Sequence, residues 1–128
     1  MLTRPSLWLT LAGLLGFTAV ALGAFGAHAL AERFAAHPRA SDWWNTAFQY
    51  QIVHTLALIG LVAVWARLSP NWANAAAIAW ILGVIVFAGT LYAMALGAPK
   101  WLGAITPIGG TTLLAGWIFI TIAAWRGA

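Results

Sequence analysis

The sequence has few charged residues and no cysteine. Only 6% of its 128 residues are charged, whereas about a quarter of the residues of a soluble domain carry a charge. This shortage excludes an ordinary soluble domain, and the lack of cysteine excludes disulfides and thiolate chemistry. The six basic and two acidic residues give a formal net charge of +4, but they are scattered singly. A nucleic-acid surface would cluster them, so we expect no nucleic-acid partner.

Long apolar runs fill the stretches between the charges. Hydrophobic residues make up 63% of the chain, and the charge-free stretches are 5–31, 43–66, 68–99 and 101–125. Each stretch can hold the roughly 20 apolar residues that cross a bilayer as a helix. We therefore predict an all-α integral membrane protein, an antiparallel bundle of four transmembrane helices. Residues 1–128 form one four-helix transmembrane domain in this prediction, with spans near 6–30, 43–66, 75–97 and 106–125.

Tryptophans and prolines indicate where these spans end. Tryptophan favours the membrane interface, and two groups of tryptophans, about one bilayer thickness apart, place both termini on one side. Pro38 is expected to stop a helical extension, and Ser41 or Asp42 to cap the second span. Pro70, with two asparagines, is expected to separate the second and third spans. Pro107 suits the first turn of the fourth span.

The end of the first span also has the form of a cleavage site. Ala27, His28 and Ala29 match the small-x-small pattern that follows a signal peptide. The apolar run before them is longer than the roughly 7–15 residues of a signal core. We therefore expect this span to be retained.

The basic residues do not decide the orientation in the membrane. Three lie on the side of the termini, and three lie on the opposite side. The positive-inside count is therefore tied. Both acidic residues, Glu32 and Asp42, lie opposite the termini, which favours termini on the inside.

Small residues recur along the predicted spans at helical spacing. Helix association in a bilayer depends on close approach of backbones, so such residues mark interfaces. The first span carries a continuous seam of alanine and glycine, and the third and fourth carry shorter lines. We predict that helix packing depends on Gly16, Gly23, Gly26, Gly83, Gly89, Gly109, Gly110 and Gly116.

Polar residues gather in one half of the predicted bundle. In an antiparallel bundle, the ends of the first and third spans meet the starts of the second and fourth. Ionisable residues within the bilayer usually face the bundle interior or a water-filled cavity. We therefore predict a polar pocket that opens to this side of the membrane. Its candidate ligand-binding residues are His28, Tyr50, Gln51, His54, Tyr92 and Thr106.

Each of these residues also has a purely structural interpretation. His28 could bond a lipid headgroup or a loop carbonyl, and Tyr50 and Tyr92 could be ordinary interfacial aromatics. Gln51 and His54 could simply form interhelical hydrogen bonds. The residues taken together suggest a pocket, but they specify no chemistry.

The residue types argue against catalysis and against a metal centre. No carboxylate lies deep in a span, no serine has a local base, and no phosphate-cradling motif occurs. The helix rise separates His28 and His54 by about 13 Å along the bilayer normal, too far to share a metal or a haem. We therefore predict no catalytic residue, no metal and no cofactor. Proton-driven transport usually needs an intramembrane Asp, Glu or His, and only His54 qualifies.

Four segments of the chain resemble a known family. They are "LGAFGAHAL" (22–30), "FQYQIVHTLAL" (48–58), "FAGTLYAMAL" (87–96) and "TPIGGTTLLAGW" (106–117), one in each span. Together they resemble the YgdD-like small membrane proteins, domain-of-unknown-function family 423, related to eukaryotic transmembrane protein 256. The resemblance implies a multi-pass protein of the bacterial inner membrane and no established activity. Ala88 stands where the family commonly has serine, which weakens any role for a hydroxyl there. The family positions present are Gly23, Gly26, His28, Tyr50, Gln51, His54, Gly89, Tyr92, Thr106, Pro107, Gly109 and Gly110.

The leading functional hypothesis is a non-enzymatic membrane protein that binds a ligand in the polar pocket. The ligand would be a lipid, a quinone-like or other small amphipathic molecule, or a partner membrane protein. The alternative is a structural or accessory module in which the motif residues only lock the helices. A haem or metal protein and a small transporter have less support. Membrane lipids are expected partners, and a homo-oligomer is compatible with the sequence.

Overall fold

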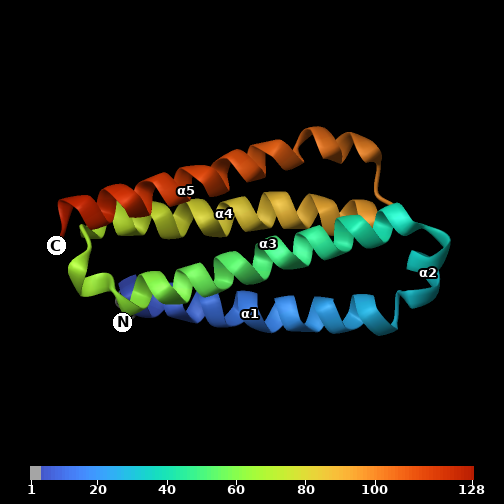
Figure 1. The fold of residues 1–128 in the computed structure, drawn as a ribbon, viewed down its shortest axis with the longest axis horizontal. Coiled ribbons are helices and arrows are strands. Elements are labelled where there is room, and N and C mark those ends of the chain that lie inside the picture. Colours follow the sequence, from blue (N-terminus) through green and yellow to red (C-terminus); the bar gives the residue numbers. More distant parts are fainter. Residues whose placement is uncertain (1–3) are drawn as a thin grey trace.

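A computed structural model of the protein describes residues 4–128, and it contains four long antiparallel helices (Figure 1). These are α1 (Arg4–His28), α3 (Pro38–Ala63), α4 (Pro70–Ala95) and α5 (Thr106–Arg126). Three short elements join them: α2 (Ala31–Ala36), η1 (Trp65–Arg67) and η2 (Lys100–Ala104). All four long helices are long and apolar enough to cross a membrane. The predicted all-α bundle of four transmembrane helices is confirmed.

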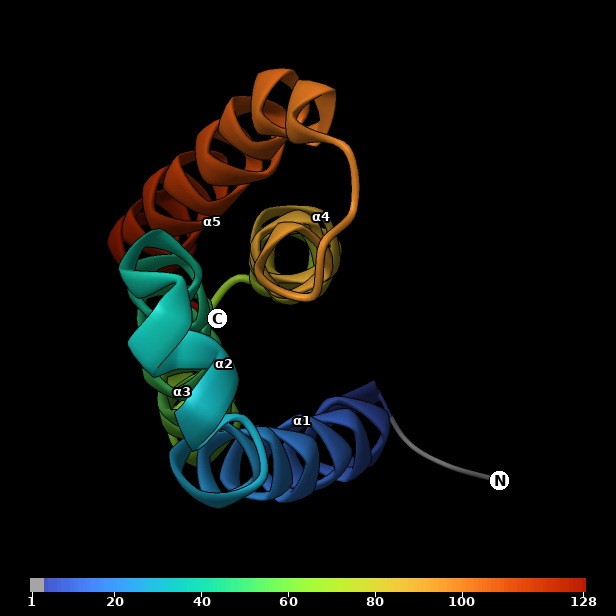
Figure 2. The ribbon, with the colours of Figure 1, turned by 90° about the vertical axis from the view of Figure 1, so that its right-hand side faces the viewer.

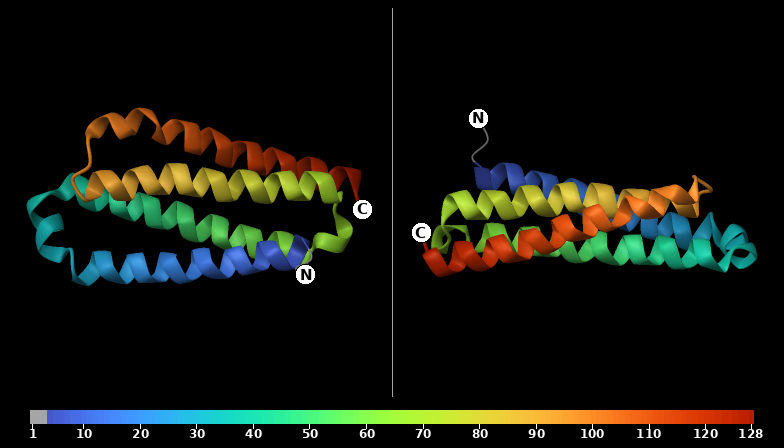
Figure 3. Two further views of the ribbon diagram at one scale, coloured as in Figure 1. Left: turned by 180° about the vertical axis from the view of Figure 1, so that it is seen from behind. Right: turned by 90° about the horizontal axis from the view of Figure 1, so that it is seen from above.

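The helices α3 and α4 pack against each other, α1 packs against α3, and α5 packs against α4 (Figure 2). The most extensive helix contacts join α4 to α5, α3 to α4 and α1 to α3. The start of α1 and the end of α5 lie at the same end of the bundle, and α5 is inclined to α4 (Figure 3). The helix ends expected to meet on one face of the membrane therefore do so.

Three of the long helices have a proline in the first turn, and two of these helices start earlier than the predicted spans. Pro38 and Pro70 do separate helices, as expected, but the helices that follow start at these prolines rather than near 43 and 75. Both prolines occupy a first helical turn, as Pro107 does in α5. Proline suits a first turn because its missing N–H would have no helical partner there. Ser41 and Asp42 consequently lie inside α3, so the predicted capping role is wrong.

The connection between α1 and α3 is partly helical. It contains the six-residue helix α2, and His37, whose backbone is not helical (φ −131°, ψ 77°), precedes Pro38. A residue before proline is pushed out of the helical region, which separates α2 from α3. At the end of α4, Gly97 adopts φ +103° and forms a turn, so it is not part of the line of small residues predicted along the third span.

Glycines allow large side chains of neighbouring helices to come close. A Cβ at Gly26 would overlap the Trp44 indole, and one at Gly116 would overlap the Trp80 indole. At Gly83 a Cβ would lie 2.6 Å from the Leu113 side chain. Contacts with neighbouring helices also surround Gly16, Gly23, Gly109 and Gly110.

Gly89 does not behave as predicted. It is exposed on α4, and an added Cβ would meet no heavy atom within 4 Å, apart from its own chain neighbours and helix backbone. Gly89 therefore makes no close contact with another helix within residues 4–128.

A buried hydrogen bond fixes α1 against the start of α4. Trp8 Nε1 donates to Asn74 Oδ1 at 2.8 Å, and the Asn74 amide donates to Pro70 O at 2.8 Å. Trp8 and Asn74 are only 8% exposed. Asn74, predicted to help break the chain, thus lies inside α4 and anchors α1.

Candidate functional site

His54 links α3 to α5 through both of its ring nitrogens. Trp117 Nε1 donates to His54 Nε2 at 3.0 Å, and His54 Nδ1 lies 2.7 Å from Tyr50 O. An indole N–H only donates, so Nε2 must accept and the proton must sit on Nδ1. The ring is therefore a neutral imidazole held in one tautomer, and neither nitrogen is free to bind a metal.

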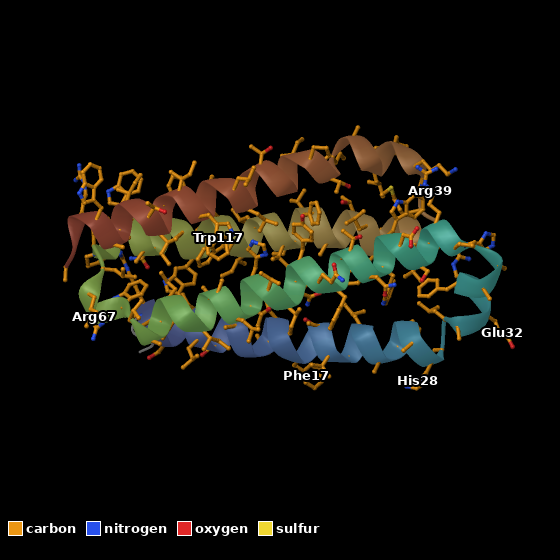
Figure 4. All side chains as sticks on the ribbon, in the orientation of Figure 1. Phe17, His28, Glu32, Arg39, Arg67 and Trp117 are labelled. Atoms are coloured by element: carbon orange, nitrogen blue, oxygen red, sulfur yellow. The ribbon has the colours of Figure 1, made fainter. Side chains whose placement is uncertain are left out.

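Aromatic rings surround His54 on three sides. The ring centroid of Trp117 lies 5.8 Å from that of His54, and the ring centroid of Trp80 lies 6.3 Å from it, both edge-on. The ring centroids of the two indoles are 4.8 Å apart. Tyr50 stacks on His54 with an interplanar angle of 14°, and its ring centroid lies 4.4 Å from that of Phe87. Figure 4 shows Trp117 directed from α5 into the interior of the bundle. These rings fix the shape of the site.

A groove of about 260 Å³ lies beside this cluster, between α3 and α5. Near the middle of α3, Tyr50 and His54 form one wall, and Phe87 contributes from α4. The α5 wall consists of Gly110, Leu113, Leu114 and Trp117. We call this cavity the aromatic groove. Tyr50 is 43% exposed, and its hydroxyl has no hydrogen-bond partner among residues 4–128.

Gln51 belongs to a separate network that joins three helices. Tyr92 Oη donates to Gln51 Oε1 at 2.7 Å. Gln51 Nε2 donates to Thr18 Oγ1 at 2.9 Å and to Leu15 O at 3.0 Å. The amide is 4% exposed, and both its nitrogen and its oxygen are used. This network connects α3 with α1 and α4, away from the aromatic groove.

Thr106 forms a third polar contact, at the start of α5. Its Oγ1 lies 2.6 Å from Thr90 Oγ1 on α4 and 3.2 Å from Leu102 O. The hydroxyl pair fastens the beginning of α5 to α4. Thr106 is buried at 9% exposure and lines none of the cavities described above.

His28 does not join any of these groups. It is the last residue of α1, is exposed, and has no hydrogen-bond partner among residues 4–128. Figure 4 shows it on the outer side of α1, away from α4 and α5. The structure therefore does not bring His28 together with the other candidate ligand-binding residues.

The predicted pocket of six residues is thus replaced by three separate arrangements. Tyr50 and His54 line the aromatic groove, Gln51 and Tyr92 bond to each other, and Thr106 pairs with Thr90. The candidate residues therefore do not line one common cavity, because they lie on different sides of their helices.

Sequence analysis missed three contributing side chains. Trp117 and Phe87 were not singled out as site residues. Thr18 was also missed, because it lies in the alanine- and glycine-rich first span without a polar neighbour one turn away.

Comparison with known proteins identifies the family. Residues 22–110 match the model described as "Protein of unknown function (DUF423)". The chain belongs to this family. A UPF0382 membrane protein of Haemophilus influenzae is 40% identical over 119 residues, covering 93% of this chain and 94% of the relative. The UPF0382 inner membrane protein YgdD of Escherichia coli is 38% identical over 118 residues, covering 92% and 88%. No solved structure matches the chain.

The family and the fold agree on the location of the protein. The Escherichia coli relative is named as an inner membrane protein, and this chain has four helices suited to crossing a membrane. The protein is therefore a multi-pass protein of the bacterial inner membrane. A relative from Staphylococcus aureus, also a UPF0382 membrane protein, is 39% identical and covers 95% of this chain and 98% of its own.

Proposed function

We propose that this protein binds a small amphipathic molecule with a flat, oxygen-bearing ring, such as a quinone, in the aromatic groove. The observation that carries the proposal is the free hydroxyl of Tyr50 on the wall of an aromatic cavity near mid-membrane. A hydroxyl at that depth has no water to bond, and leaving it without a partner is costly. A ligand oxygen would supply the missing partner.

The dimensions and lining of the groove favour a ring over a whole lipid. Its volume of about 260 Å³ is slightly below the range of about 300–1,000 Å³ for sites that enclose a drug-sized ligand. A ring would fit between Tyr50, Phe87 and Trp117, and aromatic pairs favour such offset or edge-on arrangements. An apolar tail would then extend into the surrounding acyl chains.

The same geometry supports binding without chemical conversion. Both nitrogens of His54 are already hydrogen-bonded, so no free base faces the groove. Tyr50 can donate one hydrogen bond and fix the orientation of the ring. We therefore propose a binding protein that holds its ligand within the membrane.

The test measures the thermal stability of the purified protein in mild detergent with increasing decylubiquinone. A ligand that binds only the folded state raises the melting temperature, and the rise grows with the logarithm of its concentration relative to its Kd. Decylbenzene is the matched control ligand, because it has a similar tail and a ring without oxygen. We expect stabilisation by decylubiquinone and little by decylbenzene. Equal effects of the two would contradict the proposal.

Two groove variants sharpen this test. Tyr50→Phe removes only the hydroxyl and should weaken decylubiquinone binding roughly fivefold, the equivalent of about 1 kcal/mol for one hydrogen bond. Leu114→Trp should fill the groove and abolish binding. Leu82→Trp is the control, because Leu82 is an exposed leucine of α4 that does not line the groove. Binding that survives Leu114→Trp would exclude this groove as the site.

A structural or accessory role is the second candidate, and the Gln51 network favours it. That network is fully hydrogen-bonded and joins α1, α3 and α4 without leaving a group free for a ligand. On this alternative no ligand is recovered by native mass spectrometry from protein purified out of native membranes, and Tyr50→Phe has no effect on any binding assay.

A further inference from the structure

A second cavity, of about 530 Å³, lies at the end of the bundle opposite the termini. It is bordered by α2, the start of α3, the end of α4 and the beginning of η2. Three of its lining residues are cationic: Arg33 on α2, Arg39 on α3 and Lys100 on η2. We call it the basic cavity. It is separate from the aromatic groove, with which it shares no lining residue.

The positive charge of the basic cavity is not neutralised by the chain. Glu32 and Asp42 are the only acidic residues in the sequence, and neither lines the cavity. Across residues 4–128 no ion pair joins an acidic side chain to a basic one. Figure 4 shows Glu32 pointing outward from α2, while Arg39 lies near the start of α3. Three cations therefore border one cavity without a counter-charge.

Two of the cations are held in place by contacts with the protein. Arg33 Nε donates to Ala95 O at 2.9 Å, which leaves its other N–H groups available. The Arg39 guanidinium lies over the Trp43 ring, 5.6 Å from its centroid. Ordering the side chains before binding reduces the entropy lost when a ligand binds.

The beginning of α3 adds to the positive potential. His37, Pro38, Arg39 and Ala40 all line the cavity. The start of a 26-residue helix carries partial positive charge, which favours anions. Guanidinium groups match phosphate oxygens in geometry as well as in charge.

We propose that the basic cavity binds a phosphate group at the membrane surface. The phosphate of an anionic phospholipid and free inorganic phosphate have this chemistry in common. Its place at the end of the transmembrane helices, next to Trp43, puts the cavity at the level of lipid headgroups. The volume leaves room for a phosphate together with part of a headgroup.

Native mass spectrometry of the purified protein in mild detergent tests the proposal. The protein is titrated separately with phosphatidylglycerol, with phosphatidylcholine and with inorganic phosphate. We expect phosphatidylglycerol to bind more tightly than phosphatidylcholine. Competition by millimolar inorganic phosphate would identify a phosphate site open to soluble ligands, whereas retention of phosphatidylglycerol would identify a lipid site. Equal binding of the two lipids, together with no phosphate adduct, would overturn the proposal.

Charge-matched variants locate the site. Arg39→Gln and Lys100→Gln should each weaken phosphatidylglycerol or phosphate binding about fivefold, as expected for one cation near an anionic surface. Arg67→Gln removes the same charge at the opposite end of the bundle and should leave binding unchanged. Arg33 is left intact, because its bond to Ala95 O also supports the fold. An equal loss in Arg67→Gln would show a general charge effect and overturn the assignment.

Discussion

Replacing Gln51 by leucine removes the side chain that joins α1, α3 and α4. Its amide donates to Thr18 Oγ1 and Leu15 O and accepts from Tyr92 Oη, at 2.7–3.0 Å. Hydrogen bonds between transmembrane helices average about 0.6 kcal/mol, with a maximum near 1.7. For three such bonds we expect Gln51→Leu to lower the free energy of unfolding by about 2 kcal/mol.

The free energy of unfolding is measured by reversible denaturation in mixed micelles with a rising fraction of SDS, followed by circular dichroism. Gln49→Leu is the matched control, because Gln49 is exposed on α3 and has no hydrogen-bond partner among residues 4–128. It should change the stability by less than about 0.5 kcal/mol. A double-mutant cycle with Tyr92→Phe should give a coupling of about 0.6 kcal/mol. If the Gln51→Leu and Gln49→Leu proteins are equally stable, the network does not hold the three helices together.

Two further predictions use the same unfolding assay. Gly116→Ala should cost about 1–3 kcal/mol, because its Cβ overlaps the Trp80 indole. Gly89→Ala should be neutral or stabilising by up to about 1 kcal/mol, because alanine is the better helix former and the site is open. Similar losses of stability in Gly116→Ala and Gly89→Ala would contradict the close contact assigned to Gly116. Trp117→Phe should lower the stability by about 0.6 kcal/mol or more, because His54 Nε2 loses its donor. The ¹⁵N chemical shift of His54 Nε2 should move in that variant, and an unchanged shift would refute the bond.

The spans were predictable because hydropathy and charge act over whole helices. Eight charged residues in 128 leave four gaps that only a membrane can accommodate as helices. The antiparallel order then follows from the short connections. Helix starts were less predictable, since proline both ends the preceding helix and begins the next. Pro38 does both, with His37 non-helical before it and α3 starting at the proline itself.

The sequence prediction grouped the candidate residues by their level along the helices, but it did not give their direction around the helix axis. Tyr50 and Gln51 are adjacent in sequence, but one residue turns an α-helix by about 100°. Tyr50 therefore faces Phe87 and the aromatic groove, while Gln51 faces Thr18 and Tyr92. Sequence spacing establishes which residues share a level, whereas the packing partners of each face depend on the neighbouring helices.

This separation around α3 has a consequence for the two proposed roles of the polar residues. The Gln51 network holds α1 and α4 to α3 and uses both the nitrogen and the oxygen of the amide, whereas the Tyr50 side is bounded by α5 and retains a free hydroxyl. Stability and ligand binding should therefore be separable by mutation. Gln51→Leu should lower the stability of the bundle but leave ligand binding in the aromatic groove intact. Tyr50→Phe should weaken ligand binding but leave the stability of the bundle unchanged. Loss of both properties in either variant would mean that the two faces of α3 act as one unit.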